Sequence, residues 1–343
     1  MREWGYAVLR QHFVTSSVRL SAVSVLGAGI GWLALILYPL FVLPIPGWTV
    51  CFVGLSGMLL IAIVTFGMAS KKLPTSSEPV EAVNLEARRG EPAVWLVAHL
   101  DSKGQRLSLR GRVMAVIAFG LGSAVVIGAL AVRLFGPLPW WVALPVTVLA
   151  LVGGGAMSLS APRDDSPGAV DNATGIIAAL VAASELADRT DVGVLVTDAE
   201  ELGMEGARVW IGAVGTSASF VNFDGVDSIG RYRIAMHGGR GSTTAPAGAR
   251  RALSAAIAAE LEERGEEVKV GSLPPGILVD GVVLAKGGMP GVTVSRGNWS
   301  TLGVVHTARD AADRVDVRAA VVAGHAVAAA VRRALIDGAV PAP

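Results

Sequence analysis

The chain has 343 residues, a formal net charge of +1 and only 17% charged residues. Its mean hydropathy of +0.56 is too high for an ordinary soluble enzyme. The near-zero net charge argues against a nucleic-acid partner. The single cysteine, Cys51, excludes an intramolecular disulfide and fits a reducing compartment.

The apolar excess lies in three runs without any Asp, Glu, Lys or Arg, at residues 20–70, 113–132 and 134–162. A membrane helix needs about 20 apolar residues. The first run therefore has room for two spans, broken near Leu43–Trp48, and each of the others for one. Tryptophan, which is typical of a bilayer interface, stands at these breaks as Trp48, Trp140 and Trp141. We expect four transmembrane helices.

A cleaved signal peptide is the alternative interpretation of the first run. Against it, the charged stretch before the run is long, and the apolar part exceeds the core of a signal peptide. No small-residue cleavage site stands out either. The membrane interpretation is therefore favoured.

Basic residues lie almost entirely on one side of the expected spans. The two short connecting loops contain only Arg133. The positive-inside rule therefore predicts a multi-pass protein of the plasma membrane, with both termini and all polar sequence in the cytoplasm. The basic residues that flank the spans on that side are Arg2, Arg10, Arg19, Lys71, Lys72, Lys103, Arg106, Arg110, Arg112 and Arg163.

Strand-like and helical runs alternate in the polar part of the chain, which indicates an α/β sandwich with a mostly parallel sheet. In such folds ligands bind at the carboxyl ends of the strands. The strand patterns cover residues 93–101, 192–200, 219–224 and 291–297. The helical patterns cover residues 174–189, 202–214, 248–265 and 317–335.

Histidines and carboxylates gather at the ends of these strands and at two loops between them. Singly, each could be a helix cap or a solvated carboxylate. Together they indicate a site for zinc or a related divalent ion. Their number favours two ions that share one bridging carboxylate. The candidates are His99, Asp101, Asp171, Glu200, Glu201, Asp224 and His306.

Four other polar residues receive no metal role. His12 lies near the expected membrane interface, and His325 lies in an alanine-rich helix, where a structural role is expected. His237 is interpreted as a loop residue that has a small chance of touching substrate. Asp198 is interpreted as a surface or capping residue.

Five motifs resemble, in this order, those of the co-catalytic di-zinc aminopeptidase family, whose broader members include glutaminyl cyclases and transferrin-receptor-like proteins. The resemblance covers roughly residues 78–335, with an interruption. It implies a three-layer αβα sandwich with a mostly parallel mixed sheet, as in zinc exopeptidases, here joined to four transmembrane helices. The motifs read AHLDS, SPGAVDNATG, AEELGMEGA, VNFDG and VHTARD.

The resemblance implies that two divalent ions, with zinc as the expected metal, share the carboxylate of Asp171. One ion would also be held by His99 and Asp224, and the other by Glu201 and His306. Each of these residues stands at the matching position of a family motif.

Two further roles follow from the same resemblance. Asp101 would accept the second ring N–H of His99, which fixes the tautomer of a ligand. Glu200 would act as the general base towards the attacking water. The resemblance also implies a cis peptide bond between Asp171 and Asn172.

The chain departs from the family in two places. His99 and Asp171 are 72 positions apart, far more than in the family, because the third and fourth spans lie between them. The segment VDGVVLAKGGMPG keeps Asp280 but lacks the histidine and aromatic residue that the family often carries there. Asp280 and Trp299 are therefore only weak candidates for the substrate pocket.

These observations divide the chain into five parts. Residues 1–19 form a cytoplasmic N-terminal segment and residues 20–70 two transmembrane helices. The catalytic domain comprises residues 71–112 and 163–343, interrupted by a transmembrane hairpin at residues 113–162. Arg163 is eight residues before Asp171, a reach of at most about 26–29 Å. We therefore expect the site near the bilayer, with membrane-proximal or ordinary soluble peptides as substrates.

The resulting hypothesis is a membrane-anchored, zinc-dependent aminopeptidase with peptide and lipid-bilayer partners. A glutaminyl-cyclase-like acyltransferase, which needs one ion, is the alternative. A non-catalytic membrane scaffold or receptor is disfavoured because every ligand and Glu200 are retained. A transporter is disfavoured because no charged residue lies inside a span. The oligomeric state and the preferred substrate residue stay open.

Overall fold

A computed structural model describes most of the chain. The described residues are 1–16, 18–70, 79–159, 162–214, 218–238, 247–273 and 277–340. Lys71 and Lys72, used above to predict orientation, lie outside them, as do residues 160 and 161 of the expected fourth span. The chain divides into a sheet unit (Met1–Thr15, Pro79–Gly104 and Asp165–Pro343) and a helical unit (Ser16–Glu78 and Gln105–Asp164).

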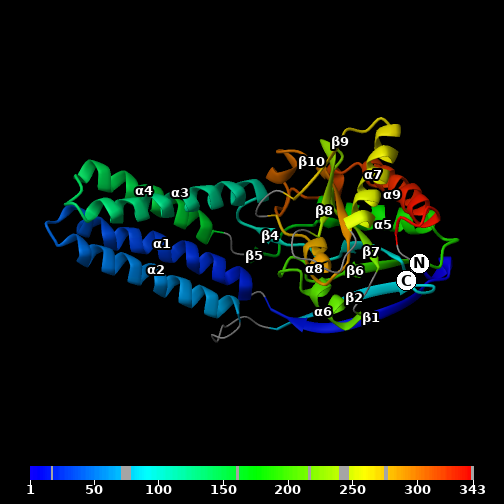
Figure 1. Ribbon diagram of the computed structural model, residues 1–343, viewed down its shortest axis with the longest axis horizontal. Coiled ribbons are helices and arrows are strands. Elements are labelled where there is room, and N and C mark those ends of the chain that lie inside the picture. The colour runs from blue at the N-terminus through cyan, green and yellow to red at the C-terminus, as the bar shows by residue number, and fades with distance from the viewer. Residues whose placement is uncertain are drawn as a thin grey trace. The chain divides into compact units, whose positions relative to one another are not determined.

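The sheet unit contains an eight-stranded mixed sheet with the strand order β1-β2-β6-β3-β7-β10-β8-β9 (Figure 1). Its centre is parallel, because β3 runs parallel to β6 and β7, and β7 runs parallel to β10. The strands are β1 (Ala7–Thr15), β2 (Val80–Arg88), β3 (Val94–His99), β6 (Val192–Thr197), β7 (Ser219–Val226), β8 (Arg231–His237), β9 (Val268–Gly271) and β10 (Gly291–Gly297). Two short strands, β4 (Gly104–Gln105) and β5 (Pro162–Arg163), fall at the chain boundaries of the units.

The strands expected from the sequence correspond to β3, β6, β7 and β10, and the other four strands of the eight-stranded sheet were not anticipated. Most unexpected is β1. Residues 7–15, treated above as part of a separate N-terminal segment, pair antiparallel with β2 from Ala7↔Arg88 to Thr15↔Val80. Exposed and partly buried positions mix along β1, so it lacks the continuous apolar run that marks a central strand. The N-terminal segment thus belongs to the sheet unit.

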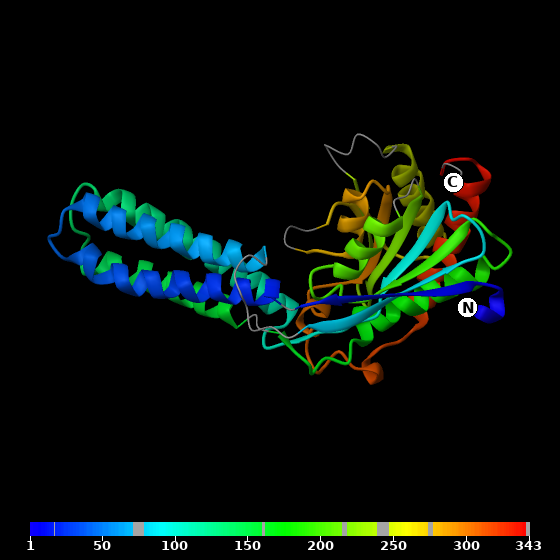
Figure 2. The ribbon, with the colours of Figure 1, turned by 90° about the horizontal axis from the view of Figure 1, so that it is seen from below.

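Helices cover both faces of the sheet, as the expected three-layer arrangement requires (Figure 2). One core cluster joins one face to α5 (Thr174–Glu185), α7 (Ala247–Glu263) and α9 (Arg318–Ile336). A second cluster joins the other face to α6 (Glu205–Val214) and α8 (Asp280–Lys286). Four short helical turns complete the unit: η1 (Arg2–Trp4), η2 (Ala169–Ala173), η3 (Thr301–Gly303) and η4 (Ala312–Arg314).

Alternation along β3 decides which face carries the polar residues. Leu96 belongs to the core under α5 and α9, whereas Trp95 and Val97 belong to the core under α6 and α8. Side chains two positions apart share a face of a strand. His99, at the carboxyl end of β3, is therefore directed to the same face as Trp95 and Val97.

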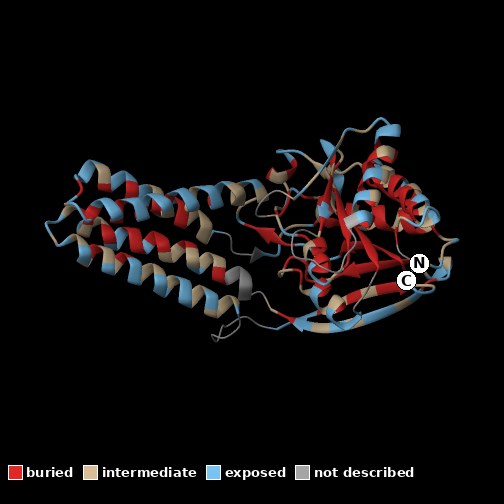
Figure 3. Ribbon diagram, viewed as in Figure 1, coloured by how far each residue is buried: buried red, intermediate tan, exposed pale blue. Residues whose placement is uncertain are grey.

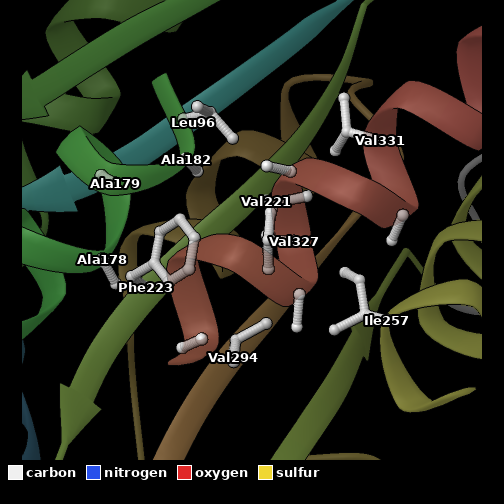
Figure 4. Close-up of a cluster of buried hydrophobic side chains, with 14 of the residues drawn as sticks. Leu96, Ala178, Ala179, Ala182, Val221, Phe223, Ile257, Val294, Val327 and Val331 are labelled. Carbon is white, nitrogen blue, oxygen red and sulfur yellow. The ribbon is translucent and has the colours of Figure 1, made fainter. Parts of the chain in front are cut away.

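Among the described residues, five helices are long and apolar enough to cross a membrane, by length and composition alone. One of them is α9, whose Val327 and Val331 lie in the core of the sheet unit beside Val221 and Ile257 (Figure 4). Packing on the sheet accounts for its apolar side. The others are α1 (Val18–Val42), α2 (Gly47–Ala69), α3 (Leu109–Arg133) and α4 (Trp140–Ser158), which correspond to the four expected spans.

The helical unit is apolar both inside and outside. Leu37, Phe41 and Val50 are buried between helices, whereas Phe52 and Phe66 are 69% and 68% exposed. In Figure 3 the exposed colour covers much of these helices. Soluble monomers rarely expose apolar patches of this extent. The exposed apolar surface therefore supports the expectation that α1–α4 contact lipid.

Arg133, which the sequence placed in a short connection, is the last residue of α3 and is almost fully buried. Its Nε donates a hydrogen bond to the Leu40 carbonyl at 3.1 Å. Its Nη2 donates to the carbonyls of Leu43 and Ile45 at 2.6 and 2.5 Å. The last carbonyls of a helix have no intrahelical donor. Arg133 therefore caps the end of α1 and stabilises the helical unit.

Candidate metal centre

The register of the parallel strands brings the first candidate ligands together. His99 pairs with Thr197 of β6, and Val97 pairs with Asn222 of β7. Asp224 lies two residues beyond Asn222, as His99 lies two beyond Val97. His99 and Asp224 therefore occupy the same face at the carboxyl ends of adjacent strands.

The structure forms two groups of side chains that could each hold a metal ion. One contains His99, Asp171 and Asp224, and the other contains Asp171, Glu201 and His306. Within each group the ligand atoms all lie within 4.8 Å of one another. These are the two sets that the family resemblance implied. Asp171, in the turn η2 before α5, belongs to both.

The two oxygens of Asp171 face different histidines. Oδ1 lies 3.0 Å from His99 Nε2, and Oδ2 lies 3.1 Å from His306 Nε2. Oε1 of Glu201 lies 2.8 Å from the same nitrogen of His306. Asp171 thus has the arrangement of a carboxylate that bridges two ions, one oxygen to each.

The donor set fits two divalent ions. Within each group the ligand atoms are near enough to one another for a single ion to contact all of them. Oε1 of Glu201 is buried and faces His306 Nε2 at 2.8 Å. Imidazole nitrogens and carboxylate oxygens are the ligands of such zinc sites. The residues therefore match the group that the sequence implied.

Histidines supply the positive charge that the buried carboxylates require. Burial alone would lower the pKa of His306, but the Glu201 and Asp171 carboxylates raise it to about 9. Burial likewise opposes protonation of His99, yet hydrogen bonds to Asp101 and Asp171 raise its pKa well above the usual value. Asp171 has a lowered pKa despite its burial, because it accepts from both histidines.

Two other carboxyl groups of the site lie in surroundings that disfavour their charged form. Burial raises the pKa of Glu200 well above its usual range, and the negative charge of Glu201 adds to this effect. Burial also raises the pKa of Asp224 to about 7. Glu200 belongs to neither ligand group, as expected for a residue that acts beside the ions.

Comparison with known proteins agrees with this geometry. The sequence pattern of Peptidase family M28 matches residues 82–331. The chain belongs to Peptidase family M28. A search of curated proteins finds no match. The family assignment therefore rests on the family pattern, which spans both proposed ligand groups.

Solved structures with a similar fold include zinc aminopeptidases. The aminopeptidase from Aneurinibacillus sp. strain AM-1 is 14% identical to the M28 protein, with a TM-score of 0.46, over 76% of this chain and 49% of that one. A zinc aminopeptidase from Bacillus subtilis is 16% identical, with a TM-score of 0.44, over 76% and 51%. The M28 protein thus spans about half the length of these chains.

Glutaminyl cyclases are also among the similar structures. The enzyme from Porphyromonas gingivalis is 14% identical, with a TM-score of 0.48, over 97% of this chain and 85% of that one. At these identities and TM-scores, no role is assigned to the M28 protein from these structures.

Asp101 makes different contacts from those that the sequence led us to expect. His99 Nδ1 lies 3.0 Å from the backbone oxygen of Asp101 and 3.5 Å from its carboxylate Oδ1. The carboxylate accepts the backbone N–H groups of Glu200 and Glu201, each at 3.0 Å. Asp101 therefore holds the Glu200–Glu201 segment in place as well as facing the imidazole.

Three residues of the site had no assigned role from the sequence. Asp310 accepts the backbone N–H groups of Val170 and Asp171, and Lys103 contacts Glu201. Asn172 donates to the Phe223 carbonyl at 2.9 Å. Asp310 ends the motif VHTARD, so its place in the motif was the available signal. The expected cis peptide bond between Asp171 and Asn172 is present.

Asp280 and Trp299, the weak pocket candidates, have different surroundings. Asp280 begins α8, is 1% exposed, and accepts a hydrogen bond from Thr197 Oγ1 at 2.5 Å. Burial raises its pKa to about 6. Trp299 is 52% exposed in the segment between β10 and η3. Trp299 is therefore the more accessible to a ligand.

The interpretation of His237 changes, whereas that of Asp198 does not. His237 is not a loop residue, because it ends β8 and is buried, with Nε2 2.7 Å from Thr293 Oγ1. Asp198 caps backbone as expected, since it accepts the N–H groups of Val83 and Ala199, both at 2.8 Å. Through Val83, it also links the end of β6 to β2.

Proposed function

We propose that this M28 protein is a membrane-anchored metallo-exopeptidase, an aminopeptidase that uses two divalent ions, with zinc as the expected metal. The observation that supports this proposal best is the position of Asp171 between His99 and His306. Both ligand groups are complete, so the chain retains a full set of residues for two ions.

Bound divalent ions would lower the pKa of a water molecule and polarise the carbonyl of the peptide bond to be cleaved. The residues of the chain then have separate tasks. Glu200 takes a proton from the attacking water on its carboxylate and passes it to the nitrogen of the leaving amine. The carboxylate of Asp101 holds Glu200 in place by accepting the backbone N–H of Glu200.

The tautomer of His99 follows from its hydrogen bond. Nδ1 lies 3.0 Å from the backbone oxygen of Asp101, which accepts only if Nδ1 carries the hydrogen. Nε2, which lies 3.0 Å from Asp171 Oδ1, would give up its own hydrogen when an ion binds. A backbone acceptor on the far nitrogen is a usual way to orient a ligating histidine.

The glutaminyl cyclase reaction is the alternative that the family leaves open. It needs one ion, whereas this protein presents two complete groups. A scaffold without catalytic activity would have no need of Glu200, buried beside the ligands. The geometry therefore supports the two-ion hydrolase over both.

The membrane assignment rests on the helical unit. Its four helices have the length and composition of membrane spans and expose large apolar side chains. We propose that they anchor the protein in the plasma membrane, with the catalytic residues on the cytoplasmic side. A preference for membrane-proximal peptides stays a prediction.

The test is metal analysis of the full chain, purified in detergent, combined with a panel of aminoacyl fluorogenic substrates and a peptide with N-terminal glutamine. We expect close to two ions per chain and release of the fluorophore, both lost on chelation and restored by zinc. One ion with conversion of the glutamine peptide to pyroglutamate would support the cyclase. The absence of bound metal and of both activities would support the scaffold.

A further inference from the structure

Lys103 is a buried lysine that contacts a proposed metal ligand. It is 7% exposed and lies two residues after Asp101. Its Nζ lies 2.5 Å from Glu201 Oε2 and 3.1 Å from the Glu201 backbone oxygen. Lysine is almost never buried without a partner. Here the partner is the ligand that the second ion would share with His306.

Asp101 and Lys103 together hold one residue from several sides. Asp101 accepts the backbone N–H of Glu201, while Lys103 donates to both the carbonyl and the carboxylate of the same residue. The loop after β3 thus fixes the backbone and one oxygen of Glu201.

The other oxygen of Glu201 is left for an ion. Oε1 lies 2.8 Å from His306 Nε2, the nitrogen that would bind the same ion. A carboxylate can bind a cation through one oxygen or through both. A cation at Oε2 would also be repelled by the positive ammonium group of Lys103, so Oε1 is the favoured ligand.

We propose that Lys103 is a positioning residue that restricts Glu201 to binding its ion through Oε1 alone. This inference rests on the proposed two-ion function. Without the ammonium group, Oε2 would be a buried acceptor without a partner, a costly arrangement. The carboxylate would then turn or bind through both oxygens, and the affinity for the ion at Glu201 and His306 would fall.

The test compares Lys103→Met and Lys103→Arg with the unsubstituted full chain. Partners of metal ligands typically contribute about 10–100-fold to metal affinity. We expect Lys103→Met to weaken binding of one of the two Zn²⁺ ions by about this factor and to leave the other unchanged. Lys103→Arg, which keeps a cationic donor, should recover most of the loss. Calorimetric zinc titration measures both affinities.

Cobalt substitution gives a second readout that does not depend on activity. Four-coordinate Co²⁺ absorbs visible light more strongly than five-coordinate Co²⁺. Binding through both oxygens should therefore lower the absorption per Co²⁺ of fully loaded Lys103→Met below that of the unsubstituted chain. Lys269→Met, which removes an exposed lysine of β9, is the matched control and should change neither readout.

The inference is overturned if Lys103→Met binds both ions as the unsubstituted chain does, or weakens both equally. If Lys103→Met does not fold, as judged by circular dichroism, Lys103→Arg decides. The inference is overturned if Lys103→Arg folds but its affinities for the two ions fall to the same extent. If the unsubstituted protein hydrolyses no peptide but Lys103→Met selectively loses one ion, the proposed activity is wrong and this inference is still supported.

Discussion

The backbone N–H of Asp171 donates a hydrogen bond to the carboxylate of Asp310, with 3.2 Å between N and Oδ2. The other oxygen, Oδ1, accepts the N–H of Val170 at 2.7 Å. Asp310 is fully buried, 139 positions away in the chain. It therefore fixes the backbone of the residue that both proposed ions share.

Replacing Asp310 should weaken both ions together. Asp310→Ala leaves two backbone N–H groups without an acceptor and frees Asp171 to shift. Groups that hydrogen-bond a metal ligand typically contribute about 10–100-fold to metal affinity. We therefore expect the zinc affinity to fall by this factor at each site, as measured by zinc titration. Asp313→Asn, at an exposed position nearby, is the control. Loss of only one ion would contradict the shared role of Asp171.

Asp171→Asn should remove both ions. The amide keeps the shape of the side chain but has one oxygen and no negative charge, so it cannot face His99 and His306 with two anionic oxygens. Metal content of the purified variant, measured by mass spectrometry, should fall from about two ions to near zero. Asp164→Asn, at an exposed position, should keep both. A variant that retains one tightly bound ion would show that Asp171 does not bridge.

Glu200→Gln should abolish turnover and leave metal content nearly unchanged. Glu200 lies outside both ligand groups, and loss of a general base typically costs about 10²–10⁴ in rate. Hydrolysis rates and metal content are measured on the same preparation. If the variant loses an ion instead, the roles of Glu200 and Glu201 are exchanged.

His237 should make stability depend on pH in mildly acidic solution. Burial lowers its pKa from 6.5 to about 4, so between these values the unfolded chain binds a proton that the folded chain does not. The stability contribution is therefore present above pH 6.5 and falls as the pH is lowered towards 4. Between pH 7 and pH 5 the loss from this group is about 2 kcal/mol.

The comparison of unsubstituted protein with His237→Gln isolates this effect, since all other titrating groups are shared. We expect the free energy of unfolding, from chemical denaturation, to fall more steeply towards pH 5 in the unsubstituted protein. Parallel curves would show that His237 has an ordinary pKa.

The orientation of the helical unit can be tested with two single cysteines in a Cys51→Ala background. Phe135 is 92% exposed in the connection between α3 and α4, and Ser166 follows α4. An impermeant maleimide should label Phe135→Cys in intact cells, and Ser166→Cys only after permeabilisation. The reverse pattern would place the catalytic residues outside the cytoplasm.

Much of the site could be predicted from sequence because its ligands stand in short motifs at the ends of apolar strands. Burial is continuous along β3 and β6 and covers most of β7, since these strands are covered on both faces. His99 and Asp224 follow from strand ends alone. The pairing of ligands into two groups came from the family resemblance, and the structure brings the same side chains near one another.

The edge of the sheet was not predictable in the same way. β1 pairs with β2 across an intervening 25-residue helix, α1, and the whole of α2. Its alternating exposure gives a weak pattern, and its only partner lies far along the chain. Local sequence therefore favours an independent segment, and only the pairing itself reveals the strand.

The sequence by itself determined which side chains could bind metal, which segments are strands or helices at the centre of the sheet, and which helices are apolar enough for a membrane. The tertiary structure alone decided the contacts between distant residues. Asp310 with Asp171, Lys103 with Glu201 and Arg133 with the end of α1 are all of this kind. The physical reason is that a buried polar group must find its partner in space, and no periodicity along the chain records where that partner lies.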